Sequence, residues 1–179
     1  MPSPQTLSDD RRRVVAAWAA DCASRVLPLF EAEAPDDGRA RDAIERARGY
    51  ARGELDAAGQ IRVRLVAGRA AASATSPAGA AAARAAAQAS GVAHMGAHAL
   101  GAAAYAAKAV GLAAPGDPHA VDDEIRWQLA AADQRVREAL RLLPPLGTDR
   151  SGPLGTGLLT AGVLGSAIRT LQERLAEQR

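Results

Sequence analysis

Alanine is the commonest residue in this 179-residue chain, with 46 copies, whereas aromatic residues make up only 3% of it. Alanine has the highest helix propensity and loses no side-chain entropy when a helix forms. A core built mainly from Ala, Leu and Val contains few bulky side chains, so the elements around it must lie close together. The composition therefore favours closely packed α-helices, and the length suffices for one domain with a real core.

Capping and turn residues divide the chain into seven expected helices. Ser8 is a favourable N-cap, because Asp9 and Asp10 follow it in the first turn. Pro28 lies inside the first pattern and is expected to kink or end it, and Gly53 is the expected stop of the second. The expected helices cover about residues 9–30, 39–52, 59–75, 78–90, 92–114, 120–143 and 155–177.

These patterns predict an all-α fold, a single-domain bundle of about seven helices that form mostly antiparallel hairpins. The domain is expected to span residues 8–179, with a disordered N-terminus over residues 1–7 and a loop over residues 144–154 before the last helix. Only Gln60–Val66 alternates weakly, as a strand would, and that run continues into an alanine-rich segment.

The charge pattern excludes several classes of partner. The net charge is only +2, and Arg11–Arg13 follow Asp9 and Asp10, so no basic cluster is long enough to bind nucleic acid. No run of eighteen strongly apolar residues predicts a membrane span, and the first ten residues do not resemble a signal peptide. A cytoplasmic protein is expected. Cys22 is the only cysteine, which excludes an intrachain disulfide and indicates a buried, inert thiol.

A polar stripe marks the expected helix over residues 92–114. His94, His98, Tyr105 and Lys108 follow at intervals of four, seven and three, which places them on one side of a helix. Three interpretations stay open: imidazoles bonded to neighbouring helices, a ligand or partner pocket, and a metal site. Two histidines at this spacing can share one metal ion, but no acidic residue lies between Asp56 and Asp117 to complete the ligand set. We therefore assign no metal and no cofactor.

A second stripe lies on the first expected helix. Trp18, Asp21 and Arg25 share one face, and Asp21 and Arg25 are spaced for an ion pair. Alternatively, Asp21 orients a histidine across a helix interface. We expect this face to meet the histidine stripe, which would give either a polar core contact or a small pocket between the first and fifth helices.

Two further segments are candidate contact regions. Asp36 and Arg39 lie in a turn of mixed charge, where local salt bridges and a partner contact are the alternatives. Gly157, Ala161 and Gly165 repeat at four-residue spacing in an uncharged run. Such small-residue spacing allows close approach of helices, either in the core or in a homodimer interface.

No catalytic template is satisfied by the sequence. There is no glycine-rich loop after a strand, no nucleophile elbow and no pair of carboxylates in an apolar setting. We therefore expect a binding protein without catalytic residues. An enzyme that uses His94 or His98 as a general base is the weakest alternative.

Three segments together resemble a known family. They are SDDRRRVVAAWAADCASRVLPLFE (8–31), PDDGRARDAIERAR (35–48) and AHMGAHALGAAAYAAKA (93–109). The chain resembles the actinobacterial putative immunity protein family, an all-helical domain classed as immunity-protein-five-like, over most of residues 8–143. The positions that match its motifs are Trp18, Asp21, Pro28, Asp36, Arg39, Ile44, His94, His98 and Tyr105.

The resemblance implies a small cytoplasmic protein that binds and neutralises a cognate toxin, and it supplies no catalytic residues. The candidate ligand- or partner-binding residues are Trp18, Asp21, Arg25, Asp36, Arg39, His94, His98 and Tyr105. The competing expectation is a small-molecule or metal-binding protein, for self-resistance or sensing, in which His94, His98 and Tyr105 line the pocket.

Overall fold

The computed structural model describes residues 3–177, and for residues 61–65 it describes the backbone only. Within these residues the secondary structure is helical, and a single bridge between Asp149 and Gly155 is the nearest approach to a strand. The prediction of an all-α fold is confirmed. The α-helices are α1 (Asp9–Glu31), α2 (Arg39–Ala51), α3 (Ala57–Ala70), α4 (Pro77–Gly91), α5 (His98–Ala113), α6 (Ala120–Ala131), α7 (Gln134–Arg141) and α8 (Gly162–Glu177), and the 3₁₀ turns are η1 (Ala71–Ser73) and η2 (Leu158–Thr160).

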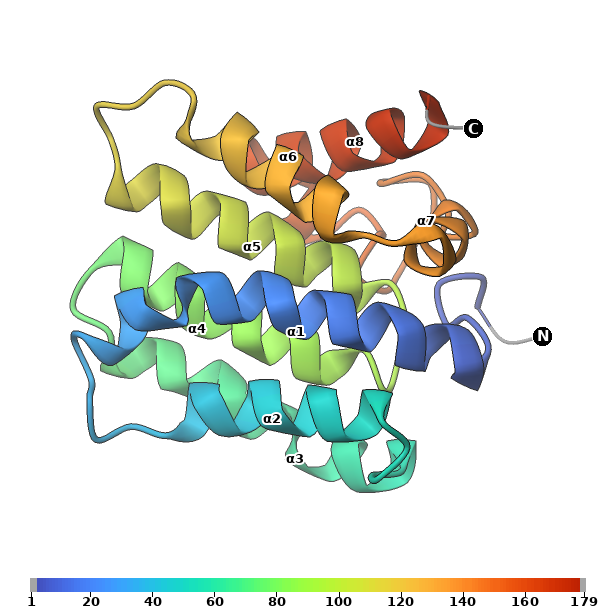
Figure 1. The fold of residues 1–179 in the computed structure, drawn as a ribbon, viewed down its shortest axis with the longest axis horizontal. Coiled ribbons are helices and arrows are strands. Elements are labelled where there is room, and N and C mark those ends of the chain that lie inside the picture. The colour runs from blue at the N-terminus through green and yellow to red at the C-terminus, as the bar shows by residue number, and fades with distance from the viewer. Residues whose placement is uncertain (1–2, 178–179) are drawn as a thin grey trace.

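Helices α1, α4 and α5 pack against one another in the middle of the molecule (Figure 1). Helices α2 and α3 cover one side of this group, and α6 and α8 pack against α5 on the other side. Helix α7 contacts α1 and α8. Both α4 and α5 are rich in buried alanines: Ala82, Ala85, Ala86, Ala99, Ala102, Ala103 and Ala106 are all fully buried. Their small side chains permit the close approach that the composition predicted.

Several helix boundaries follow directly from local sequence. Ser8, Asp56 and Ser76 each cap a helix by accepting a hydrogen bond from the backbone three residues later. Gly53, just beyond α2, has φ of +81°, a left-handed conformation that a glycine adopts without strain. Pro28 lies within α1, which continues to Glu31. The backbone of the Gln60–Val66 segment is part of α3, so the weak alternation there does not form a strand.

The expected helix over residues 92–114 begins six residues later than predicted. Residues 92–97 form turns, and α5 begins at His98. The backbone amides of Gly96 and Ala97 donate to the carbonyl oxygens of Thr6 and Gln5, each at 3.0 Å. These tertiary bonds use donors that a continuous helix would direct to its own preceding turn.

The expected helix over residues 120–143 is two helices. Asp133 caps α7 by accepting from the amide of Val136 at 2.8 Å. The Arg137 guanidinium donates to the carbonyl oxygens of Leu129 and Ala132, at 2.9 and 2.7 Å, which satisfies acceptors at the end of α6. The apolar period continues across this break, so hydrophobic spacing alone did not reveal it.

The C-terminal helix also begins later than expected, at Gly162. Gly157 and Ala161 lie in extended backbone outside it, and only Gly165 lies within it. The three small residues therefore do not form one helical face, and the helical premise of the predicted homodimer interface is wrong. A Cβ at Gly165 would collide with the backbone of Thr160, so this glycine serves packing within the chain. No helix in the described part of the chain is long and apolar enough to cross a membrane.

The N-terminal segment is more ordered than predicted. Residues 1 and 2 lie outside the described residues, but Gln5 is only 1% exposed. Its side-chain amide donates to Asp149 Oδ2 at 2.6 Å and to the Ser151 carbonyl oxygen at 2.8 Å, and its Oε1 accepts from the amide of Leu154 at 2.9 Å. The prediction of disorder is therefore wrong for residues 3–7, because a buried glutamine ties them to a distant loop.

Candidate functional site

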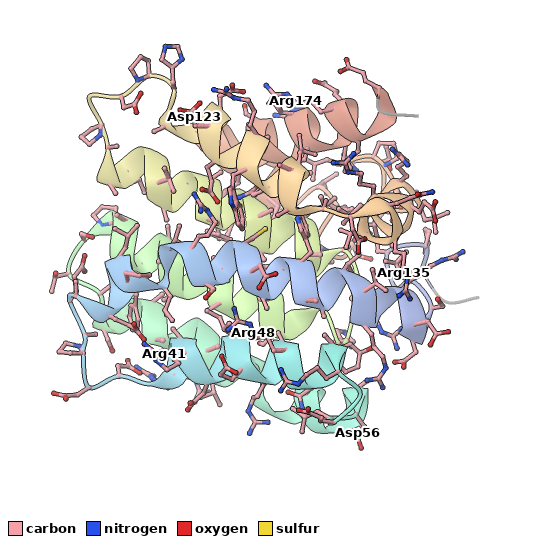
Figure 2. All side chains as sticks on the ribbon, in the orientation of Figure 1. Arg41, Arg48, Asp56, Asp123, Arg135 and Arg174 are labelled. Atoms are coloured by element: carbon pink, nitrogen blue, oxygen red, sulfur yellow. The ribbon has the colours of Figure 1, made fainter. Side chains whose placement is uncertain are left out.

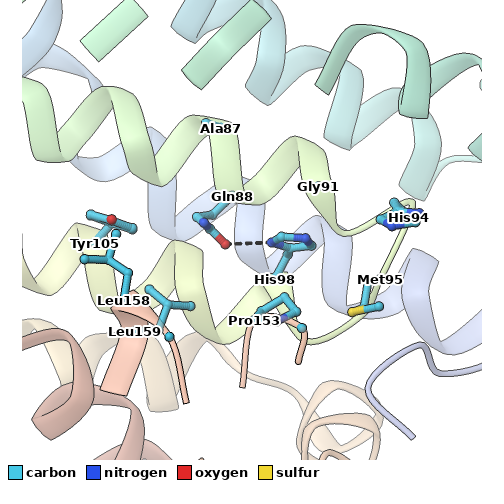
Figure 3. Close-up of a pocket in the computed structure, with 12 residues that line it drawn as sticks. Ala87, Gln88, Gly91, His94, Met95, His98, Tyr105, Pro153, Leu158 and Leu159 are labelled. Atoms are coloured by element: carbon cyan, nitrogen blue, oxygen red, sulfur yellow. Dashed lines mark hydrogen bonds between the residues drawn. The ribbon is translucent and has the colours of Figure 1, made fainter. Parts of the chain in front are cut away.

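A cavity of about 500 Å³ lies between α4, the start of α5 and the loop over residues 152–159 (Figure 3). We call it the α4–α5 pocket. The residues that line it are Ala87, Gln88, Gly91, His94, Met95, His98, Tyr105, Gly152, Pro153, Gly157, Leu158 and Leu159. Its volume lies within the range of small-molecule sites in proteins, roughly 300–1,000 Å³.

A hydrogen bond between two helices forms one side of the pocket. His98 Nδ1 lies 2.7 Å from Gln88 Oε1 (Figure 3). Because an amide oxygen can only accept, this arrangement fits the tautomer in which His98 Nδ1 carries the hydrogen. The bond fixes the imidazole orientation and directs the Gln88 amide nitrogen away from the ring.

Two glycines make room for this pair. A Cβ at Gly91 of α4 would lie 2.9 Å from Cγ of His98, and a Cβ at Gly101 of α5 would collide with Gln88 Oε1. Each polar side chain therefore lies against the backbone of the opposite helix. Larger residues at either glycine would displace the pair, so the small-residue contact of α4 with α5 positions the polar groups of the pocket.

Tyr105 supplies a third polar group to the pocket. Its side chain is 4% exposed and its hydroxyl forms no hydrogen bond with any described residue. Burial raises the pKa of Tyr105, and the charge of Arg84 opposes this shift. The phenol therefore stays protonated at neutral pH and can donate to a molecule in the pocket.

The opposite wall is apolar and comes from the C-terminal loop. In Figure 3, Pro153 lies beside His98, Leu158 lies beside Tyr105, and Leu159 lies between these two places. Leu158 is 72% exposed, the largest exposed fraction among the large hydrophobic residues described. Met95 completes the apolar lining near His94.

Gln5 connects the two sides of the α4–α5 pocket. Its backbone carbonyl holds the turn between α4 and α5 through Ala97, and its side chain holds Asp149, Ser151 and Leu154. The two pocket walls, residues 87–105 and 152–159, are thus joined through one buried residue of the N-terminal segment.

The histidine stripe is thus partly as predicted. His94, His98 and Tyr105 line one pocket, but His94 lies in the turn before α5 and Lys108 does not contribute to the lining. The expected position of the pocket, between the first and fifth helices, is wrong. No residue of α1 lines the pocket, because the stripe faces α4 and the C-terminal loop.

The face of α1 that carries Trp18 and Arg25 meets α6 instead of the histidine stripe. Trp18 Nε1 donates to the Gln128 carbonyl oxygen at 2.8 Å. Arg25 pairs with Glu124 at 3.0 Å and lies over the Trp127 ring, 4.0 Å from its centre. Glu124 is almost fully buried, so the Arg25 charge offsets the cost of its burial.

Asp21 does not pair with Arg25 and does not orient a histidine. It lies 3.3 Å from Arg48 of α2 (labelled in Figure 2), in an exposed ion pair. Both predicted roles of Asp21 are therefore wrong, because Arg25 turns toward the buried carboxylate of Glu124. Cys22, the next residue, is fully buried as expected, and this burial raises the pKa of its thiol well above the ordinary value.

Trp18 and Asp21 contribute to a second cavity, which we call the α1–α7 groove. It measures about 580 Å³ and is lined by Asp10, Arg13, Val14, Ala17, Trp18, Asp21, Ala51, Arg52, Ala131, Asp133, Arg135 and Val136. Its rim carries three aspartates and three arginines, and its floor consists of small and apolar residues. Asp10 and Arg135 are exposed, and their side chains form no hydrogen bond or ion pair with the described residues.

The turn before α2 contains the last two candidates. Arg39 donates to both carboxylate oxygens of Asp37 and to the Ser73 hydroxyl. Asp36 is exposed, and no described residue pairs with its side chain. Arg39 therefore anchors this turn locally, and neither residue reaches the α4–α5 pocket or the α1–α7 groove.

The described residues contain no group of three His, Cys, Asp or Glu side chains that could hold a metal ion. The α4–α5 pocket offers hydrogen-bonding side chains and an apolar surface.

Sequence reasoning missed Gln88 and the C-terminal wall of the pocket. Gln88 and Arg84 are the only two long polar residues among the alanines and glycines of α4, which is a signal that could have drawn attention to Gln88. Pro153, Leu158 and Leu159 carry no comparable signal, because only tertiary folding brings them to α5. In the groove, Arg13, Arg52, Asp133 and Arg135 were also missed, since surface charges of this kind are common in helical proteins.

Comparison with protein-family models gives a match over residues 5–135 to the family described as Imm-5 like putative immunity protein. The chain belongs to this family. The part of the chain that matches the Imm-5-like family includes α1–α6, and thus Gln88, His98 and Tyr105. The wall at residues 152–159 lies beyond it. No curated protein and no solved structure matched the chain.

Proposed function

We propose that this protein neutralises a cognate protein toxin by binding it directly, without catalysing a reaction. The observation that carries this proposal is the match of residues 5–135 to a family described as immunity proteins. The absence of a catalytic template in the sequence is consistent with a role in binding.

The α1–α7 groove is the surface we assign to the toxin. Nearly all of its lining residues lie within residues 5–135, where a function common to the family would reside. The groove combines an apolar floor with a charged rim, which resembles the core and rim of protein interfaces. Trp18 is present in the floor, although it is only 2% exposed.

The charge of the groove indicates the kind of partner surface. The aspartates and arginines on the rim nearly balance, and the chain as a whole carries only +2. A strongly basic toxin surface would be better matched by an acidic face. The toxin surface that fits this groove therefore carries both signs of charge, placed opposite Asp10 and Arg135.

The test is a binding titration with the toxin domain encoded beside the gene for this protein. Arg135→Glu should weaken binding at least tenfold, because it reverses a free charge at the rim. Arg69→Glu, an equal charge change at an exposed position on α3, is the matched control and should leave binding unchanged. If neither the wild type nor the control binds the toxin, the proposed function is wrong. If Arg135→Glu and Arg69→Glu bind the toxin equally well, only the assignment of the groove is wrong.

A further inference from the structure

We propose that the α4–α5 pocket binds a small, neutral, largely apolar molecule that carries a hydrogen-bond acceptor. This binding site is separate from the α1–α7 groove, because the two cavities share no lining residue. The inference does not depend on the proposed toxin binding.

Unused donors in the pocket require an acceptor on the ligand. The Tyr105 side chain is only 4% exposed, and its hydroxyl has no hydrogen-bond partner among the described residues. The Gln88 oxygen is occupied by His98 Nδ1, whereas its amide nitrogen donates to no described residue. Gln88 is half-buried, and neither donor is among the fully buried polar atoms without a partner, so both face the open side of the pocket. A bound acceptor replaces the water that these donors otherwise meet.

The pocket lining disfavours an ionised ligand. Asp, Glu, Lys and Arg are all absent from the residues that line it. A cationic ligand meets no carboxylate in the lining, and an anionic ligand meets no Lys or Arg there, so either would lose hydration without gaining a permanently charged partner, which is unfavourable in a partly enclosed site. A carbonyl or ether oxygen satisfies the same donors without this penalty.

The remaining lining favours an apolar ligand body. Met95, Pro153, Leu158 and Leu159 face the polar pair across the cavity (Figure 3). The volume of about 500 Å³ accommodates a molecule with two fused rings and substituents.

The pocket walls are held in place before any ligand arrives. Gly91 and Gly101 fit against His98 and Gln88, and Gln5 ties the C-terminal loop to the turn before α5. A pocket whose side chains are already fixed loses less conformational entropy on binding. This arrangement distinguishes the pocket from a gap between mobile surface side chains.

The experiment uses two neutral probes, coumarin and quinolin-2(1H)-one, and one anionic probe, coumarin-3-carboxylate. Each is titrated into the full-length protein while the side-chain amide resonances of Gln88 are followed by ¹⁵N NMR. Both neutral probes should shift these resonances in a saturable manner. At alkaline pH, coumarin-3-carboxylate should bind at least tenfold more weakly, because the lining then offers no cationic side chain: it contains no Lys or Arg.

Two variants test the assigned contacts. Tyr105→Phe should weaken binding of the neutral probes about fivefold to tenfold, the effect of one lost hydrogen bond. It should not unfold the protein, because the hydroxyl has no hydrogen-bond partner among the described residues. Leu158→Ala should also weaken binding, whereas Leu112→Ala, at another exposed leucine, should not.

Three results would overturn the proposal. They are the absence of saturable shifts with both neutral probes, equal affinity for the anionic probe, and unchanged affinity in Tyr105→Phe. Leu158 is largely exposed, so its variant remains folded and informative even if Tyr105→Phe does not fold.

Discussion

The backbone amide of Leu154 donates a hydrogen bond of 2.9 Å to Oε1 of Gln5, a residue 149 positions earlier in the chain. The same side chain donates to Asp149 and Ser151, and the Gln5 carbonyl oxygen accepts from Ala97. One buried glutamine therefore holds both the turn before α5 and the C-terminal loop, and with them the two sides of the α4–α5 pocket.

Replacing Gln5 with alanine should destabilise the protein by about 2–4 kcal/mol, because the Leu154 amide and the Ser151 carbonyl lose a buried partner. Urea unfolding measures the loss, and faster hydrogen exchange of the Leu154 amide locates it. Gln134→Ala is the control, since Gln134 is exposed and bonds only to Glu138 in its own helix. Equal stability of the two variants would show that Gln5 does not tie the loop.

Glu33 should make stability depend on acid pH. Its carboxylate accepts hydrogen bonds from the hydroxyl and backbone amide of Ser76 and from Thr75, which lowers its pKa from 4.5 to about 2. Because the folded-state pKa is lowered, this stabilisation is complete above the unfolded pKa and is lost as the pH falls from about 4.5 toward about 2.

The variant Glu33→Gln has no charge to titrate at this position. Its melting temperature should therefore fall less than that of the wild type between pH 5 and pH 3, values chosen to straddle roughly the unfolded pKa. Glu173→Gln, at an exposed position of α8, is the control and should follow the wild type. The explanation fails if Glu33→Gln and the wild type lose the same number of degrees.

Replacement of two helical glycines by alanine should change the stability of the protein in opposite directions. Gly91→Ala places a methyl group 2.9 Å from Cγ of His98, so we expect a loss of about 1–3 kcal/mol and displacement of the imidazole. Gly68 has nothing within 4 Å of its Cβ position, so Gly68→Ala should stabilise α3 by about 0.5–1 kcal/mol. Thermal unfolding measures the sign of each stability change. A stabilising effect of Gly91→Ala would contradict the packing of Gly91 against His98.

A double-mutant cycle should reveal coupling between Arg25 and Glu124. The Glu124 side chain is 2% exposed, and Arg25 supplies its cation. Because Arg25 itself is 42% exposed, Arg25→Leu should cost about 2–3 kcal/mol, below the full penalty of an unpaired buried charge. Glu124→Gln in the Arg25→Leu background should recover most of this loss, and simple addition of the two single losses would exclude the coupling.

Local chemistry made much of the fold predictable. The cap at Ser8 and the stop at Gly53 act within a few residues, and α1, α2 and α4 lie close to their expected ranges. The later boundaries depend on tertiary contacts. The amides of Gly96 and Ala97 bond to the N-terminal segment, and Arg137 satisfies the end of α6, so the helical period around them was misleading.

The candidate site was predictable only in its α5 half. The spacing of His94, His98 and Tyr105 indicated a shared site, and all three line one pocket. Their partner could not be inferred, because helical spacing identifies a face but not the element that packs against it. The stripe was expected to meet α1, whereas Gln88 of α4 and Leu159 of the C-terminal loop meet it instead.

The most direct test of the account is a titration of toxin activity with the purified protein. Neutralisation by binding predicts that inhibition grows in proportion to the protein added, stops at one equivalent and coincides with formation of a one-to-one complex by calorimetry. Inactivation of the toxin by a small fraction of an equivalent, increasing with time, would contradict this account and indicate an enzyme. Full toxin activity in the presence of excess protein would contradict the immunity role itself.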